Sequence, residues 1–322
     1  MMRRLLPFLL LLLLVVAGCG GGGTAASNQV SAVAAVYPLG WVAEQVAPDA
    51  EVSLLAAGGL EAHDLEITPG QREAIQTSEV VLYVGDIAYQ PQVESAVESA
   101  EGEIVSLSEV AGDERLLEPG EDPHAHGEGE EGEGEEHAGE SEDEHSGEGV
   151  VDAHIWFDPE VMADVATRTG EAFAAADPDN ADTYRENAAA LSEELTGLGG
   201  DLDGILGGEC RHDEAIVSHQ AYGYLLEPYG YEQHGVTGIN PEAGSSSAEL
   251  AELVREIERE GFEYVLAEPV EGRAGAETVA REAEVELLEI SPLDAVTDDQ
   301  AESGFPSLVR DQAAQFARAL GC

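Results

Sequence analysis

The histidines are the residues of this sequence best suited to chemistry, because imidazole exchanges protons near neutral pH and is a common metal ligand. The chain has 322 residues, nine of them histidine. Four lie within one acidic stretch: His124, His126, His137 and His145. Five lie where apolar residues recur regularly: His63, His154, His212, His219 and His234. Of these five, His212 and His234 are interpreted as surface or edge-strand residues.

The acidic tract covers residues 121–149. It holds 13 Asp and Glu residues and almost no apolar side chains. Such a composition cannot bury enough surface to fold, so it predicts a disordered loop. A mobile group of imidazoles and carboxylates can still bind Zn(II) weakly and in many geometries. Two interpretations therefore remain, a charged spacer and a low-affinity collector of metal ions.

Three histidines outside the tract occupy positions typical of ligand sites. His219 lies at the carboxyl end of a predicted strand, and His63 lies in a loop between a predicted strand and a helix. His154 lies four residues before a predicted helix N-cap. Loops at the carboxyl ends of parallel strands are where α/β proteins bind ligands. Because 91 and 65 residues separate the three, spacing alone equally allows histidines that are merely hydrogen-bonded.

The elements that must position these histidines alternate between strand and helix. Strands are predicted before the acidic tract at 30–36, 51–56, 79–84 and 103–107. They are predicted again near the C-terminus at 214–218, 231–236, 262–267 and 285–290. Between the two sets, apolar residues recur at steps of three and four from Tyr184 to Ile205, which predicts one long helix. The fold class is therefore α/β, with two α/β lobes joined by a single long backbone helix.

Glycines weaken the helix prediction for the second half of that segment, because each lowers helix stability relative to alanine. They are Gly197, Gly199, Gly200 and Gly204.

Charge and the N-terminus limit the possible partners and location. The net charge is −54; such a surface repels nucleic acid and anionic lipid headgroups and attracts cations, so nucleic acid is not expected as a partner. A basic start, a short apolar stretch and small residues before Cys19 predict a bacterial lipoprotein signal peptide, the alternative being a plain secretory signal with an incidental cysteine. In that exported setting, Cys210 and Cys322 are expected to form a disulfide, the alternative being two unpaired thiols.

Four segments give the sequence a family resemblance. They are GGLEAHDLEITPGQ, DAHIWFDP, SHQAYGYLLEPYGY and the later LAEP. In this order they resemble the zinc-uptake, cluster A-I type of substrate-binding lipoprotein of ABC transporters, over nearly the whole mature chain. The resemblance implies a ligand cleft between the lobes, capture of Zn(II) as the transported ligand, an ABC permease as partner, and a lipid-anchored monomer on the extracytoplasmic face of the membrane.

The same resemblance implies the ligands. His63, His154 and His219 match the family's first, second and third metal ligands. Manganese-selective relatives carry Asp just before the Pro-Leu that follows the last core strand, where this chain has Ser291. The fourth position is therefore left to a water, to Glu61 or to the Ser291 site. Three imidazoles with few carboxylates favour Zn(II) over metal ions that prefer oxygen.

The expected organisation and the alternatives follow from these interpretations. Residues 1–18 form the signal peptide, 19–28 the lipidated tether, 29–177 the N-terminal lobe, 178–206 the connecting helix and 207–322 the C-terminal lobe. The alternatives are a binding protein for Mn(II) or another divalent metal, a zinc hydrolase and a cell-surface adhesin. No HExxH, GxSxG or Walker motif supports an enzyme.

Overall fold

The computed structural model describes residues 29–56, 62–63, 65–117, 151–239, 244–269 and 272–322. Several predictions lie outside these residues. They concern the signal peptide, Cys19, Glu61, and the tract histidines His124, His126, His137 and His145.

The N-terminal lobe is built on a four-stranded parallel sheet of order β2-β1-β3-β4. Its strands are β1 (Ser31–Ala34), β2 (Glu51–Leu54), β3 (Val80–Tyr83) and β4 (Glu103–Ser106). Its helices are α1 (Tyr37–Val46), α2 (Pro69–Thr77), α3 (Pro91–Val97) and α4 (Leu107–Ala111), followed by the 3-10 turn η1 (Asp113–Arg115). All four residues of β3 are apolar and buried, as expected for a strand covered on both faces.

The C-terminal lobe repeats this plan with a parallel sheet of order β6-β5-β7-β8. Its strands are β5 (Glu214–His219), β6 (Glu232–Thr237), β7 (Tyr264–Ala267) and β8 (Glu286–Glu289). The shorter helical elements are α7 (Gly223–Leu226), η3 (Glu227–Tyr229), α8 (Ser247–Glu260), α9 (Arg273–Glu282) and α10 (Asp298–Ala301). In each sheet the first strand lies between the second and the third, so the strand order changes direction there. Ligands of such parallel sheets bind outside the carboxyl ends of the strands at this point.

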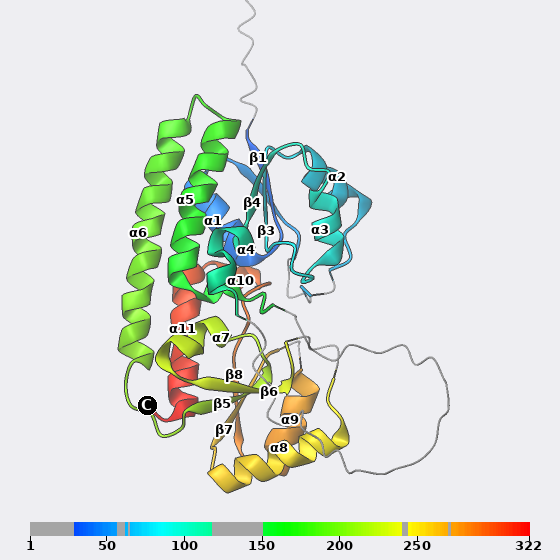
Figure 1. Ribbon diagram of the computed structural model, residues 1–322, viewed down its shortest axis with the longest axis vertical. Coiled ribbons are helices and arrows are strands. Elements are labelled where there is room, and N and C mark those ends of the chain that lie inside the picture. The colour runs from blue at the N-terminus through cyan, green and yellow to red at the C-terminus, as the bar shows by residue number, and fades with distance from the viewer. Residues whose placement is uncertain (1–28, 57–61, 64, 118–150, 240–243, 270–271) are drawn as a thin grey trace, which may run out of the picture.

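Three long helices run along the molecule: α5 (Pro159–Ala176), α6 (Ala181–Leu206) and α11 (Phe305–Leu320). Figure 1 shows α6 beside the N-terminal lobe at one end and beside α11 and the C-terminal lobe at the other. With 26 residues, α6 is about 39 Å long at about 1.5 Å per residue. The predicted weakening by glycine does not interrupt α6, because its buried leucines, Leu195, Leu198 and Leu202, continue along one face through that region.

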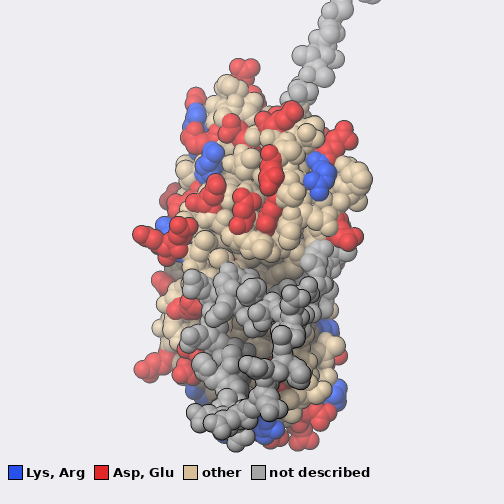
Figure 2. Space-filling model, turned by 45° about the vertical axis from the view of Figure 1, so that its right-hand side comes forward, with Lys and Arg blue, Asp and Glu red and all other residues tan. Residues whose placement is uncertain are grey.

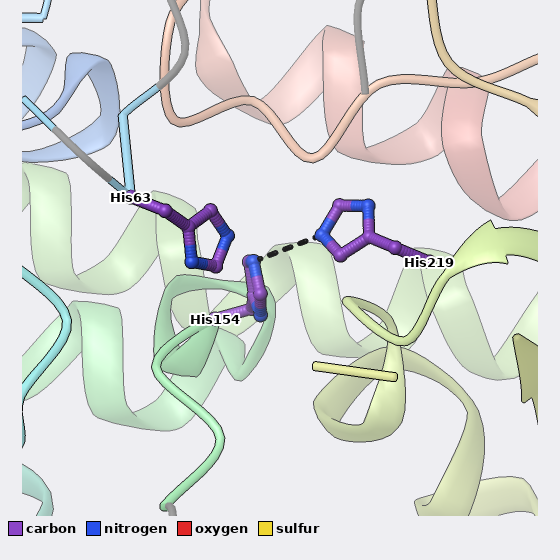
Figure 3. A group of neighbouring side chains, drawn as sticks. All are labelled: His63, His154 and His219. Atoms are coloured by element: carbon purple, nitrogen blue, oxygen red, sulfur yellow. Dashed lines mark hydrogen bonds between the residues drawn. The ribbon is translucent and has the colours of Figure 1, made fainter. Parts of the chain in front are cut away.

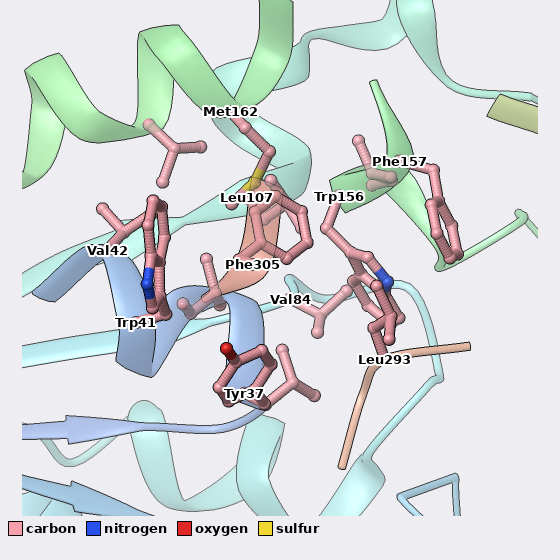
Figure 4. Close-up of a cluster of buried hydrophobic side chains, with 14 of the residues drawn as sticks. Tyr37, Trp41, Val42, Val84, Leu107, Trp156, Phe157, Met162, Leu293 and Phe305 are labelled. Atoms are coloured by element: carbon pink, nitrogen blue, oxygen red, sulfur yellow. The ribbon is translucent and has the colours of Figure 1, made fainter. Parts of the chain in front are cut away.

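The hydrophobic core joins the two ends of the chain. Phe305, the first residue of α11, packs on Trp41 of α1 with the ring centroids 5.7 Å apart. Figure 4 shows both rings in one cluster with Leu107 and Met162. The segment after β8 therefore returns to the N-terminal lobe, and α11 then runs back along α6.

Three further features concern the chain's setting. Cys210 and Cys322 are joined as a disulfide, which ties the last residue to the start of the second lobe. Among the described residues, no helix has the length and apolarity needed to cross a membrane. Acidic side chains greatly outnumber basic ones on the face drawn in Figure 2, in keeping with the net charge of −54.

Candidate metal centre

The three histidines singled out by their places in the sequence meet in one buried position. His63 comes from the loop after β2, His219 is the last residue of β5, and His154 directly precedes the 3-10 turn η2 (Ile155–Phe157). Figure 3 shows the three rings pointing toward a common centre. One ring nitrogen from each histidine lies within 4.8 Å of the others. The site thus draws on both lobes and is largely shielded from solvent, since His154 and His219 are fully buried and His63 is 9% exposed.

The spacing fits a shared metal ion. Zn–N bonds of about 2.0–2.1 Å in a tetrahedral site put neighbouring ligand atoms roughly 3.3–3.4 Å apart. The Nε2 atoms of His154 and His219 are 3.5 Å apart. The Nε2 atom of His63 is buried and has no hydrogen-bond partner among the described residues. Buried polar atoms are normally satisfied, so this nitrogen is best explained by a ligand it binds.

Carboxylates fix the orientation of two of the rings. Nδ1 of His154 lies 2.7 Å from Asp152 Oδ1, and Nδ1 of His219 lies 2.6 Å from Glu268 Oε2. A carboxylate accepts the Nδ1 proton, so the lone pair of each imidazole is on Nε2 and faces the centre. The hydroxyl of Tyr222 donates to Glu268 Oε1 at 2.7 Å and holds that carboxylate in place.

A further buried carboxylate, Asp294, lies close to the histidines. Its Oδ2 accepts a hydrogen bond from the Tyr89 hydroxyl at 3.1 Å. Burial raises the pKa of Asp294, while the nearby imidazoles of His154 and His219 oppose that rise. Burial likewise raises the pKa of Glu268 well above its usual range, and the Tyr222 hydrogen bond opposes this. The environment therefore disfavours carboxylate charge unless a cation is present to balance it.

Desolvation also keeps His63 in the form that binds metal. Burial, reinforced by the charges of His154 and His219 when protonated, lowers the pKa of His63 to about 2. An imidazole must be neutral to coordinate a metal ion. In the folded protein His63 is therefore ready to bind over the whole physiological pH range.

Of the two residues considered for the fourth position, the structure describes Ser291, which is buried. Ser291 uses its Oγ to accept a hydrogen bond from the Leu293 amide at 3.2 Å, within a local turn. Glu61 lies outside the described residues. The buried carboxylate of this turn is Asp294, directly after the Pro-Leu pair rather than before it. Leu293 has a positive φ of 64°, an uncommon conformation for a residue with a side chain. The backbone changes direction at this residue, and the next side chain, Asp294, is buried.

Sequence reasoning also missed the carboxylates that orient the rings, although a signal for one was present. Glu268 directly follows β7, the same kind of position that drew attention to His219. Asp152 lies two residues before His154, and its proximity depends on a turn that periodicity does not reveal. The other two structured histidines lie outside the three-histidine group, with His212 packed on Phe262 at 4.6 Å between ring centroids and His234 on the edge strand β6.

Comparisons with known proteins agree with this architecture. Residues 32–319 match the family described as "ZnuA: Zinc-uptake complex component A periplasmic". The chain is 29% identical over 279 residues to the zinc-binding lipoprotein AdcA of Streptococcus pneumoniae serotype 4, covering 86% of this chain and 52% of that protein. It is 26% identical over 283 residues to the high-affinity zinc uptake system protein ZnuA of Bacillus subtilis, covering 86% and 82%.

The chain spans about half the length of the AdcA proteins it matches. Among solved structures, the Zn(II)-bound ZnuA-like domain of Streptococcus pneumoniae AdcA superposes with a TM-score of 0.68 at 23% identity, covering 91% of this chain and 100% of that one. At this identity the structural likeness establishes the shared two-lobe fold.

Proposed function

Because this chain belongs to the zinc-uptake complex component A family, we propose that it captures Zn(II) outside the cytoplasm and delivers the ion to an ABC permease in the membrane. The observation that carries the proposal is the meeting of three buried imidazoles from both lobes, with ligand atoms within 4.8 Å. Related proteins named for zinc binding and zinc uptake support the choice of ion.

His63, His154 and His219 are the proposed ligands. Three neutral imidazoles suit a borderline ion such as Zn(II), whereas Mg(II), Ca(II) and Mn(II) prefer oxygen. The fourth position falls to a water, Glu61 or Asp294. An oxygen ligand such as Asp294 would move the preference toward Mn(II), so competition between the two ions is the decisive comparison.

The protein is proposed to bind and carry the ion rather than to use it for catalysis. The relatives that the chain matches are named for zinc binding and zinc uptake, and the sequence carries no HExxH, GxSxG or Walker motif. The adhesin alternative has no supporting feature in the described residues.

Limited movement between lobes is expected. The chain passes between the lobes in α6, in the segment after β8 and in α11, and α6 packs on both α5 and α11. Uptake and release therefore rest on small displacements of the loops that carry the histidines rather than on wide hinge closure.

Two segments outside the described residues, the one around Cys19 and the acidic tract, also have a part in the proposal. A lipid on Cys19 would hold the monomer at the membrane, and the tract histidines His124, His126, His137 and His145 would collect zinc weakly near the cleft. Removal of residues 121–149 is expected to lower the total zinc capacity and leave one tight site. Equal loss of tight binding would overturn this division of roles.

The test is zinc titration of the mature protein by calorimetry with chelator competition, repeated with Mn(II). One tight Zn(II) per chain is expected, with Mn(II) bound more weakly. His63→Ala, His154→Ala and His219→Ala should each abolish tight binding, while His212→Ala, which removes a histidine outside the group, should not. Retention of tight binding in all three site variants would refute the proposal, and turnover of model esters by the zinc-loaded protein would favour a hydrolase.

A further inference from the structure

A second group of metal-ligand side chains lies on the C-terminal lobe. Glu214 opens β5, His234 lies on the edge strand β6, and Glu256 lies on α8. His234 pairs in register with Ile216 of β5, so Glu214, two residues before Ile216, faces the same side of the sheet. That side packs against α8, because Ile216 shares a hydrophobic cluster with Leu253 and Ile257 of that helix.

The distances within this group match those of a metal site. Nδ1 of His234 lies 3.1 Å from Glu256 Oε2 and 3.6 Å from Glu214 Oε1. One oxygen or nitrogen of each residue lies within 4.8 Å of the others. Ligand atoms around a tetrahedral ion with bonds of about 2.0–2.2 Å are roughly 3.3–3.6 Å apart. The distance to Glu256 lies just below that range and the distance to Glu214 lies at its upper end, so small side-chain shifts would accommodate an ion.

Charge favours a cation at this position. Burial, and then the carboxylates of Glu256, Glu232, Asp213 and Glu260, raise the pKa of Glu214 to about 7. The Nδ1 atom of His234 carries at most one proton, which it can donate to one carboxylate oxygen at a time. Arg259 contacts Glu256 through the other oxygen, Oε1, at 3.4 Å, so the oxygen that faces His234 remains directed into the group.

The side chains are accessible to an ion yet sheltered. Their exposed fractions are 13% for His234, 14% for Glu256 and 26% for Glu214. Charges at such a position are less well solvated than fully exposed charges, so they interact more strongly with one another and with a bound cation. A dication bound to two carboxylates and a neutral imidazole would neutralise more of the local negative charge than a proton does.

We propose that Glu214, His234 and Glu256 form a second site for a divalent transition-metal ion such as Zn(II), separate from the three-histidine centre. Two carboxylate oxygens and one imidazole nitrogen form a donor set that Zn(II) uses in proteins. Water completes the coordination from the exposed side. The site binds more weakly than the buried centre, because its ligands are partly solvated and already engaged with one another.

The test compares His234→Gln with His212→Gln by equilibrium dialysis against Zn(II), both in a His63→Ala background that removes the tight site. His212 is a matched control, since it is a histidine of the same lobe outside the group. Both variants keep the acidic tract, so zinc bound there cancels in the difference. We expect His234→Gln to bind one equivalent fewer than His212→Gln, and the double variant Glu214→Gln/Glu256→Gln to show the same loss.

A second measurement locates the ion. Crystals of the wild-type protein soaked in Zn(II) should show anomalous scattering between Glu214, His234 and Glu256 as well as at the three-histidine centre. Equal zinc uptake by the two histidine variants, with no anomalous signal between the three side chains, would show that the group is an ion-pair network only. An anomalous signal between Glu214, His234 and Glu256 but none at the three-histidine centre would overturn the proposed transport function and still support this second site.

Discussion

Nδ1 of His219 and Oε2 of Glu268 are 2.6 Å apart, and both side chains are almost completely buried. This contact determines which nitrogen of His219 faces the metal centre. The histidine and the carboxylate lie 49 residues apart, at the carboxyl ends of neighbouring strands β5 and β7. The orientation of one ligand is thus set by the pairing of two strands.

Glu268→Gln is expected to weaken zinc binding about 10–100-fold, the usual cost of losing a carboxylate partner of a ligating histidine. The amide can donate to Nδ1 and so favour the wrong tautomer of His219. Chelator competition measures the affinity. Glu289→Gln, which alters an exposed carboxylate at the end of β8 in the same lobe, should leave it unchanged, and equal affinities for the two variants would contradict the orienting role.

Asp294→Asn is expected to reduce zinc affinity by about tenfold or more, because it removes a buried negative charge that balances the ion. If Asp294 binds the metal directly, the variant should also raise the ratio of Zn(II) to Mn(II) affinity, since an oxygen ligand is lost. Competition titrations with both ions measure the two effects. If the affinities for both ions are unaltered, Asp294 neither binds the metal nor balances its charge, and its role is limited to the hydrogen bond with Tyr89.

The metal-free protein is expected to lose stability as the pH falls below about 6.5. The pKa of His63 is lowered to about 2 in the folded protein and is about 6.5 in the unfolded chain. Between these values the unfolded chain binds a proton that the folded protein excludes, so the free energy of unfolding falls with pH by at most about 1.4 kcal/mol per unit.

Denaturant unfolding at pH 7 and pH 5, with a chelator present, compares the wild-type protein with His63→Gln. The variant lacks this titration and should show the smaller decrease in stability. Identical pH dependence in the two proteins would mean that His63 does not remain neutral in the folded state.

Replacing both cysteines of the disulfide with serine is expected to lower the free energy of unfolding by about 2–5 kcal/mol, because the bond closes a long loop in the unfolded chain. The sequence separation is 112 residues. Zinc affinity should change little, since Cys210 precedes β5 whereas His219 is the last residue of that strand, so the disulfide lies at the opposite end of β5 from the metal centre. Thermal unfolding and zinc titration of Cys210→Ser/Cys322→Ser measure the two quantities.

Much of the fold follows from local patterns. The strands of both lobes lie within a few residues of their predicted positions, since runs such as Val80–Tyr83 are apolar throughout. The start of helix α8 (Ser247–Glu260) is likewise encoded locally, because Ser246 and Glu249 form a capping box. Short elements such as α4 and α10 were not predicted, because four or five residues carry too little periodicity.

The candidate site was only partly predictable. Rules about strand ends identified His219 and can also identify Glu268, whereas the position of Asp294 depends on the backbone reversal at Leu293. His63 and His154 come together through tertiary packing between segments 91 residues apart, and spacing in the sequence does not predict such contacts. The three histidines were assigned to one site by the family resemblance and not by local sequence patterns.

The contact of Phe305 with Trp41 has a consequence for how this protein can be divided. A fragment that ends after β8 would lack the ring that covers Trp41, and the N-terminal half would expose apolar surface to water. Neither half is therefore a self-contained module that could be exchanged with that of a relative. Successful chimeras would have to carry the last thirty or so residues together with the first half, as matched pieces of one interior.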